Sequence, residues 1–220
     1  MLFEIFTILT IDFSYELIKN IFNLNHSNSS KWFYVHSLTN AVISYYSLYD
    51  IKQCISDISR CYFIEWNNYS YTVYKLSQLI HIYHSIFYKL KRNDYIHHIL
   101  MCGIAGPLLY YQQSILSSLA LFFLTGLPGM IDYFLLFMVK NKIIDSYTEK
   151  IIYIYISTWL RSPGCILTVA LCIPGIKYNY YNNYLKFIGL IIMSSLVFWN
   201  GQYYLYCTYS DYYKKLIKYY

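Results

Sequence analysis

The sequence contains a succession of long apolar runs, and this feature restricts the fold more than any motif does. Hydrophobic residues make up 57% of the 220 residues, and charged residues make up only 13%. A largely apolar stretch of about 20 residues is long enough to cross a lipid bilayer as a helix. We therefore predict an all-α membrane protein with about seven transmembrane helices. The predicted helices cover residues 2–22, 33–51, 69–89, 95–113, 114–139, 150–174 and 184–208.

Three of these runs have distinctive features. The first run is interrupted by Glu4, Asp12 and Glu16, so it could lie in the membrane interface instead of crossing the bilayer. The fourth and fifth runs follow each other almost without a loop, which predicts a tight antiparallel hairpin. Glycines and prolines inside these two runs favour kinks and close helix contacts. They are Gly103, Gly106 and Pro107 in the fourth run and Gly126, Pro128 and Gly129 in the fifth.

The distribution of Lys and Arg between the loops predicts the orientation. With seven crossings, eleven basic residues lie on one side of the membrane and four on the other. Loops rich in Lys and Arg stay in the cytosol, so we expect the N-terminus in the lumen and the C-terminus in the cytosol. Because the net charge of +6 is explained by topology, we expect no nucleic acid as a partner. The eleven are Lys19, Lys31, Lys89, Lys91, Arg92, Lys140, Lys142, Lys150, Lys214, Lys215 and Lys218, and the four are Lys52, Arg60, Lys177 and Lys186.

The six cysteines lack the paired spacing that is typical of a zinc site, and we predict no metal. Cys54 and Cys61 share one loop and could form a disulfide if that loop is luminal. Separate free thiols are the interpretation that we favour.

Polar residues of several predicted helices fall at a similar depth near the cytosolic side. Such residues are costly inside a membrane and commonly mark a functional site. On the third run they recur every three or four positions, so they form one stripe that should face inward. We predict a shared lipid cavity lined by His36, Asn40, Gln78, His81, His84, Asp132, Arg161 and Asn200. Individual tyrosines are not weighed as site residues, because the chain contains 30 of them.

The candidate catalytic residues are the adjacent pair His97 and His98, together with Asp94. In a helix, the Asp94 carboxylate stands one turn before both rings and could reach either of them. Such a contact would fix one tautomer and raise the basicity of the ring, as a general base or a nucleophile requires. Adjacent helical positions differ by about 100° around the axis, so both rings could line a wide cavity but hardly hold one metal ion. The alternative is that the pair only forms hydrogen bonds between helices.

Arg161 precedes a Pro-Gly break and has two interpretations. It could clamp a phosphate or carboxylate group, or it could pair with Asp132. We favour the pairing. Six histidines are too few for the histidine clusters of membrane di-iron enzymes.

Three stretches of the sequence form a familiar combination. They are Trp32 with His36-Ser37-Leu38-Thr39-Asn40-Ala41, then Asp94-Tyr95-Ile96-His97-His98, then Phe198-Trp199-Asn200-Gly201-Gln202. Together they resemble the TLC-domain family, which groups translocating-chain-associating membrane proteins, longevity-assurance ceramide synthases and their ceroid-lipofuscinosis relatives. The chain is more similar to the short, poorly characterised branch of that family.

The resemblance covers residues 31–215 and implies a barrel-like bundle of six helices there. Residues 1–30 would form a preceding transmembrane or interfacial segment and loop, and residues 216–220 a cytosolic tail. The family resemblance also implies a location in the endoplasmic reticulum. Membrane lipids are the expected partners, no bound cofactor is expected, and a homodimer is left open.

The resemblance leaves two functions open. The first is lipid homeostasis, including that of sphingolipids, through the binding or regulation of membrane lipids. The alternative is a ceramide-synthase-like N-acyltransferase with acyl-CoA as co-substrate, in which His97 or His98 activates a long-chain amine or carries the acyl group and Asp94 orients the ring. After the paired histidines, those synthases continue with a threonine and acidic residues, whereas this chain has Ile99-Leu100-Met101-Cys102. Whether the protein is an enzyme therefore stays open.

Overall fold

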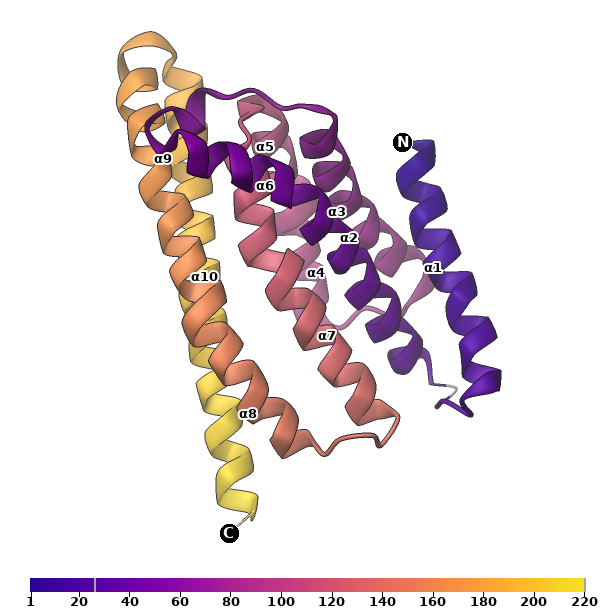
Figure 1. Ribbon diagram of the computed structural model, residues 1–220. Coiled ribbons are helices and arrows are strands. Elements are labelled where there is room, and N and C mark those ends of the chain that lie inside the picture. The colour runs from indigo at the N-terminus through magenta and orange to yellow at the C-terminus, as the bar shows by residue number, and fades with distance from the viewer. Residues whose placement is uncertain (26, 220) are drawn as a thin grey trace.

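The computed structural model describes residues 1–25 and 27–219, and helices joined by short connections build this part of the chain (Figure 1). It contains no strand, so the prediction of an all-α protein is confirmed for the described residues. His26 in the first loop and Tyr220 in the predicted tail lie outside them. The α-helices are α1 (Leu2–Ile21), α2 (Asn28–Ser56), α3 (Asn68–Phe87), α4 (Arg92–His98), α5 (Gly106–Gln112), α6 (Leu116–Leu121), α7 (Leu127–Lys140), α8 (Ser146–Ile156), α9 (Ser162–Asn182) and α10 (Tyr184–Tyr219).

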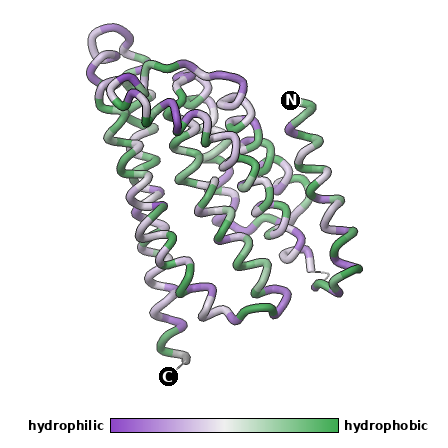
Figure 2. Tube along the Cα trace, viewed as in Figure 1, coloured by the Kyte–Doolittle hydropathy of each residue, from purple (hydrophilic) through white to green (hydrophobic). Residues whose placement is uncertain are grey.

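Within the described residues, three helical runs are long and apolar enough to cross a membrane, namely Leu116–Lys140, Ser146–Asn182 and Tyr184–Ile217. They indicate a membrane-embedded protein. Hydrophobic residues cover much of these helices, whereas hydrophilic residues are concentrated in the connections at their ends (Figure 2). α2 is more polar, because many of its buried side chains are those of Ser, Thr and Asn.

α2 packs against α1, α3, α6 and α7. Its small polar side chains allow α7 and the turn before it to approach closely. A Cβ atom at Gly126 would lie 3.0 Å from Ser44 Oγ, and one at Gly129 would lie 2.7 Å from Asn40 Nδ2. The close helix contact predicted for these two glycines is therefore present.

Three helical runs each contain a π-helical stretch shortly before a proline. The stretches are η2 (Ile99–Ala105), η3 (Phe122–Gly126) and η4 (Ser157–Arg161). In each case a proline follows two positions after the stretch ends, namely Pro107, Pro128 and Pro163. Proline has no N–H, and its ring clashes with the carbonyl group four residues earlier, which lies inside the π stretch in all three cases. The predicted kinks are thus widened turns within continuous helices.

Most connections lie at two opposite ends of the bundle, and the two chain termini lie at opposite ends as well (Figure 1). At one end, the Asn25 side chain donates to the Lys140 carbonyl at 3.0 Å, and Lys215 donates to Ser146 Oγ at 2.9 Å. We call this the basic end, because Lys19, Lys31, Lys140, Lys142 and Lys150 lie in or beside its connections. At the other end, the Gln112 side chain donates to the Lys186 carbonyl at 2.9 Å.

A disulfide joins Cys54 to Cys61 at this other end, which we call the disulfide end. The prediction of two free thiols was therefore wrong. The sequence allowed the bond but did not favour it, because a local turn brings the two residues together. The Asp57 side chain accepts a hydrogen bond from the backbone N–H of Arg60 at 3.2 Å, which starts the 3₁₀ helix η1 (Ile58–Phe63). This turn brings the two Cα atoms to 4.8 Å, within the range that a disulfide requires.

The fourth and fifth predicted runs meet in a tight turn, as expected. α5 ends at Gln112, Gln113 adopts a left-handed conformation with φ 49°, and α6 begins at Leu116. The two runs then pack against different partners. α5 lies mainly against α10, whereas α6 lies against α2, α3 and α9. The predicted hairpin is thus a sharp turn rather than a pair of helices packed side by side.

Candidate functional site

Histidines from three helices gather in a cavity of about 440 Å³ near the basic end, which we call the histidine chamber. A second cavity of about 170 Å³ adjoins it and reaches η4 and α10, and we call this one the arginine cavity. Of the predicted site residues, the chamber is lined by His36, His81, His84, Asp94, His97, His98 and Asp132. The arginine cavity is lined by His36, His81, Asp94, His97, Asp132, Arg161 and Asn200.

His81 sets the tautomer of His97. His81 Nδ1 lies 2.5 Å from the Ser77 carbonyl oxygen, one turn earlier in α3. A carbonyl oxygen only accepts, so Nδ1 carries the hydrogen and Nε2 of the neutral ring does not. That Nε2 lies 2.9 Å from His97 Nε2, which must therefore donate. His97 is left with an unprotonated Nδ1 that has no hydrogen-bond partner among the described residues.

A second chain of hydrogen bonds passes through His98. Ser85 Oγ donates to the His81 carbonyl at 2.9 Å, so the oxygen of this hydroxyl accepts from His98 Nδ1 at 2.8 Å. His98 Nε2 then accepts from His84 Nδ1 at 3.2 Å. Both nitrogens of His98 are thus occupied, and the unprotonated nitrogen at the end of this chain is His84 Nε2.

His36 offers a hydrogen-bond donor, whereas His84 and His97 each offer an acceptor. Its Nδ1 accepts from Asn40 Nδ2 at 3.0 Å, and Thr125 Oγ1 donates to Asn40 Oδ1 at 3.0 Å, which fixes the orientation of the amide. The hydrogen of a neutral His36 is therefore on Nε2. Asn40 supports His36 and does not line the cavity as predicted.

Aromatic rings hold two of the histidines in place. Trp32 stacks on His84 with ring centroids 3.8 Å apart and an interplanar angle of 11°. Tyr133 stacks on His36 with centroids 3.8 Å apart and an angle of 12°. This stacking restricts the orientation of each imidazole ring, so its nitrogens stay directed at the partners described above.

Asp94 does not make the predicted contact with His97 or His98. Its Oδ2 accepts from the backbone N–H of Lys91 at 2.7 Å and caps the first turn of α4. A carboxylate at this position satisfies an amide that has no partner within the helix, which explains why it turns away from the rings. The groups that orient the paired histidines come from α3 instead.

Arg161 does not pair with Asp132 as predicted. Its Nη1 donates to the Tyr153 hydroxyl and its Nη2 to Asn200 Oδ1, both at 2.9 Å. The guanidinium carbon also lies 4.3 Å from the centroid of the Tyr204 ring. Asp132 lines the same cavity but forms no hydrogen bond or ion pair within the described part of the chain.

Gln78 is the other predicted cavity residue that lies outside the lining. Its Nε2 is 3.4 Å from Ser77 Oγ, and its Oε1 would be 2.6 Å from a Cβ atom at Gly106. Gln78 therefore packs α3 against Gly106 at the start of α5.

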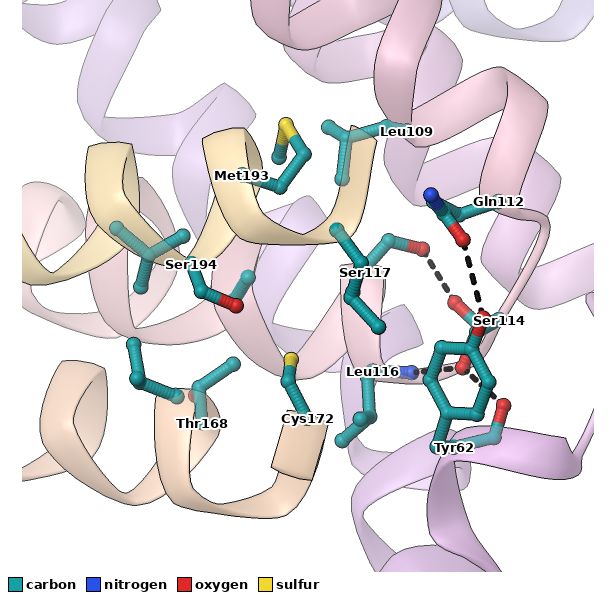
Figure 3. A pocket seen from close by; sticks show the side chains of 14 residues that line it. Tyr62, Leu109, Gln112, Ser114, Leu116, Ser117, Thr168, Cys172, Met193 and Ser194 are labelled. Atoms are coloured by element: carbon teal, nitrogen blue, oxygen red, sulfur yellow. Dashed lines mark hydrogen bonds between the residues drawn. The ribbon is translucent and has the colours of Figure 1, made fainter. Parts of the chain in front are cut away.

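Narrow apolar pockets continue from the arginine cavity towards the disulfide end. The first, of about 70 Å³, shares His97, Met101, Leu124 and Asn200 with that cavity. The second, of about 40 Å³, adjoins the first through Leu109, Ala120, Met193 and Val197. Figure 3 shows the second pocket, with Leu109 and Met193 facing it from one side and Thr168 and Cys172 from the other. At its edge, the Tyr62 hydroxyl donates to Gln112 Oε1 at 3.1 Å.

Several residues of the site were missed from the sequence. Tyr133, Tyr153 and Tyr204 hold His36 or Arg161, but the abundance of tyrosine hid them. Helical spacing contained the signal, since Tyr204 follows Asn200 by one turn and Tyr153 precedes Arg161 by about two turns.

The arrangement offers two basic nitrogens, one donor, one guanidinium and one unpaired carboxylate around connected spaces. It can bind a charged or polar group and can accept a proton from it. The described residues hold no group of three or more His, Cys, Asp or Glu side chains that could bind a metal ion. No family model matches the chain, and no curated protein or solved structure matches it.

Proposed function

We propose that this chain is a multi-pass membrane protein of the TLC type that binds a membrane lipid inside its helix bundle. The headgroup would occupy the two polar cavities, and the hydrocarbon chain would enter the apolar pockets. One observation carries the proposal: His97 lines the histidine chamber, the arginine cavity and the first apolar pocket. Polar and apolar spaces that meet at one residue fit an amphiphile better than a fully polar or a fully apolar ligand.

We further propose seven crossings, with six of the helices in a barrel-like domain, in the membrane of the endoplasmic reticulum. The N-terminus would be luminal and the C-terminus cytosolic. The loop lysines at the basic end support this orientation. The Cys54–Cys61 disulfide at the opposite end supports it independently, because disulfides persist in the lumen and not in the cytosol. The histidine chamber would then open towards the cytosol.

The lipid-binding proposal is tested by blocking the junction between polar and apolar space. Leu124 lines both the arginine cavity and the first apolar pocket, whereas Leu167 is 50% exposed on α9. Cells that express the wild type, Leu124→Trp or Leu167→Trp are fed a photoactivatable fatty acid, and cross-linked peptides are mapped by mass spectrometry.

We expect cross-links at pocket residues such as Met193 in the wild type and in Leu167→Trp, and their loss in Leu124→Trp. Cross-links on the outward faces of the helices should be equal in all three proteins and serve as the internal standard. Wild-type protein with outward cross-links only, or a folded Leu124→Trp protein with undiminished pocket cross-links, would overturn the proposal.

The tautomer of His97 favours a second candidate function, N-acyl transfer from acyl-CoA to a long-chain amine. The unprotonated Nδ1 could accept a proton from the attacking amine as the new C–N bond forms and the C–S bond of the thioester breaks. The proton would then pass to the departing thiolate. Lys89 and Lys91 line the chamber and could contact the phosphates of the CoA moiety.

This candidate is tested by incubating purified protein with a sphingoid base and acyl-CoA and measuring the amide product. His97→Asn should abolish the product. His98→Asn should only reduce it, because both nitrogens of His98 are already occupied by Ser85 and His84. Absence of the amide with folded wild-type protein, or equal loss in both variants, would contradict the role assigned to His97.

A further inference from the structure

Arg161 is a buried cation without an anionic partner. Its side chain is only 8% exposed, and the groups that contact it are the Tyr153 hydroxyl, the Asn200 amide and the Tyr204 ring, which are all neutral. Its Nε atom is buried and has no hydrogen-bond partner. Removing a charge from water is costly unless an opposite charge compensates it. Within the described residues, no anion contacts the Arg161 guanidinium.

Asp132, on helix α7, is an anion without a cationic partner among the described residues. It lines both the histidine chamber and the arginine cavity, yet it forms no hydrogen bond or ion pair with any described residue. Lys150, at the start of the neighbouring helix α8, is already paired with Glu149 at 3.3 Å. The two unpaired charges thus border one cavity of about 170 Å³ without meeting each other.

We propose that the arginine cavity binds a zwitterionic headgroup, with its anionic group against Arg161 and its ammonium group against Asp132. This inference rests on the proposed lipid-binding function and specifies the ligand of the same site. Each Nη atom of the guanidinium carries a second N–H besides the one that binds Tyr153 or Asn200, and a phosphate can accept hydrogen bonds from these. An ammonium group donates hydrogen bonds, which the Asp132 carboxylate can accept. The hydrocarbon chain would leave the cavity past His97 and Leu124 into the first apolar pocket.

The test compares two lysolipids that share one acyl chain and differ only in the headgroup, together with a soluble headgroup that has no chain. Lysophosphatidylethanolamine carries both a phosphate and an amine, whereas lysophosphatidylglycerol carries the phosphate alone. Free O-phosphoethanolamine has the zwitterion without the chain. Affinities are measured by isothermal titration calorimetry on purified full-length protein in detergent. We expect the zwitterionic lysolipid to bind about tenfold more tightly than the anionic one, because one charge-assisted contact distinguishes them.

Two variants separate the two ends of the headgroup. Asp132→Asn should lower the affinity for lysophosphatidylethanolamine to that for lysophosphatidylglycerol and leave the latter unchanged. Arg161→Gln should weaken both by about tenfold or more, because the phosphate contact is common to them. If Arg161→Gln does not fold, Asp132→Asn alone tests the proposal, because its effect is read as the ratio of the affinities for the two lysolipids. The surface variant Asp211→Asn, whose partner Lys214 is exposed, should change neither affinity.

A stability measurement distinguishes a ligand contact from a structural one. Without ligand, Asp132→Asn should melt at the same temperature as the wild type or higher, because it removes an unpaired, partly buried carboxylate. A lower melting temperature would show that Asp132 holds the fold and would overturn its assignment as a ligand contact.

The remaining outcomes separate this inference from the proposed function. Equal affinity of the wild type for both lysolipids, or a parallel loss of both in Asp132→Asn, would overturn the zwitterion site and leave lipid binding intact. Failure of both lysolipids to bind would overturn the proposed function itself. If free O-phosphoethanolamine bound as tightly as the lysolipid, the zwitterion site would stand, and a soluble ligand would replace the lipid.

Discussion

His97 and His81 meet through their Nε2 atoms at 2.9 Å, and the hydrogen between them belongs to His97. This assignment follows from the Ser77 carbonyl, which forces the hydrogen of His81 onto the opposite nitrogen. The basic nitrogen of His97 is thus set by a backbone atom of another helix. No carboxylate takes part in the relay.

The two relays should respond to mutation separately. His81→Leu removes the acceptor of His97 and should allow both tautomers of that ring, while His98 keeps its own. Ser85→Ala removes the acceptor of His98 Nδ1 and should disturb His98 and leave His97 unchanged. The ¹⁵N chemical shifts of labelled histidines report which ring nitrogen is protonated. A protonated Nδ1 on wild-type His97, or the same response of both rings to either variant, would contradict the relays.

A glycine contact between the start of α9 and η3 should contribute to stability. A Cβ atom at Gly164 would lie 2.0 Å from Phe123 Cδ1, whereas one at Gly103 would lie 4.0 Å from its nearest neighbour. We expect Gly164→Ala to lower the free energy of unfolding by about 1–3 kcal/mol through overpacking. Gly103→Ala should leave it unchanged or raise it by up to about 1 kcal/mol. Unfolding in mixed micelles measures both, and similar effects of the two variants would show that Phe123 moves aside without cost.

The disulfide should stabilise the disulfide end and should be present in protein from cells. The bond closes a loop with a sequence separation of 7 residues, for which the chain-entropy model gives about 2 kcal/mol. Cys54→Ser should therefore lower the free energy of unfolding by about that amount, and Cys207→Ser, which removes a free thiol, should not. Alkylation of denatured protein with and without prior reduction counts the bonded thiols. Full alkylation without reductant would place this loop in a reducing compartment and would contradict the proposed orientation.

Acid should weaken the start of α8 through Asp145, which lies between two apolar helices. The Thr148 hydroxyl, together with the backbone N–H groups of Thr148 and Tyr147, donates hydrogen bonds that lower the pKa of this carboxyl below its ordinary value of 3.8. The charged form is therefore favoured in the folded protein. Its contribution to stability is complete above the ordinary pKa and is lost as the pH falls through the lowered one.

The matched variant is Asp145→Asn, which can still cap the helix but does not titrate. Melting temperatures between pH 3 and pH 7 should fall more steeply towards low pH in the wild type than in Asp145→Asn. Parallel curves would show that the hydrogen bonds seen at this cap do not favour the charged form.

The fold class and the location of the site could be predicted from the sequence because both depend on patterns within single helices. Apolar runs predict helices, and His81 and His84 recur on one face of α3. The partners of each side chain depend on which helices pack together, and the pattern within one helix does not predict this. Asp94 was expected to contact a histidine three or four positions away, but the unpaired amide of Lys91 was a nearer competitor. The same limit applies to Arg161, whose partners lie on α8 and α10.

The three π stretches bear on how one bundle can hold both polar and apolar space. η2 contributes Met101 to the arginine cavity, η3 contributes Leu124, and η4 contributes Arg161. An extra residue in a helical turn rotates everything beyond it by about 100°, so each helix changes phase at the level of this cavity. Towards the basic end the helices present one side to the two polar cavities, and towards the disulfide end they present another side to the apolar pockets. Deleting one residue from any of the three stretches would realign the two halves and turn a different set of side chains inward, while the helix itself stayed intact.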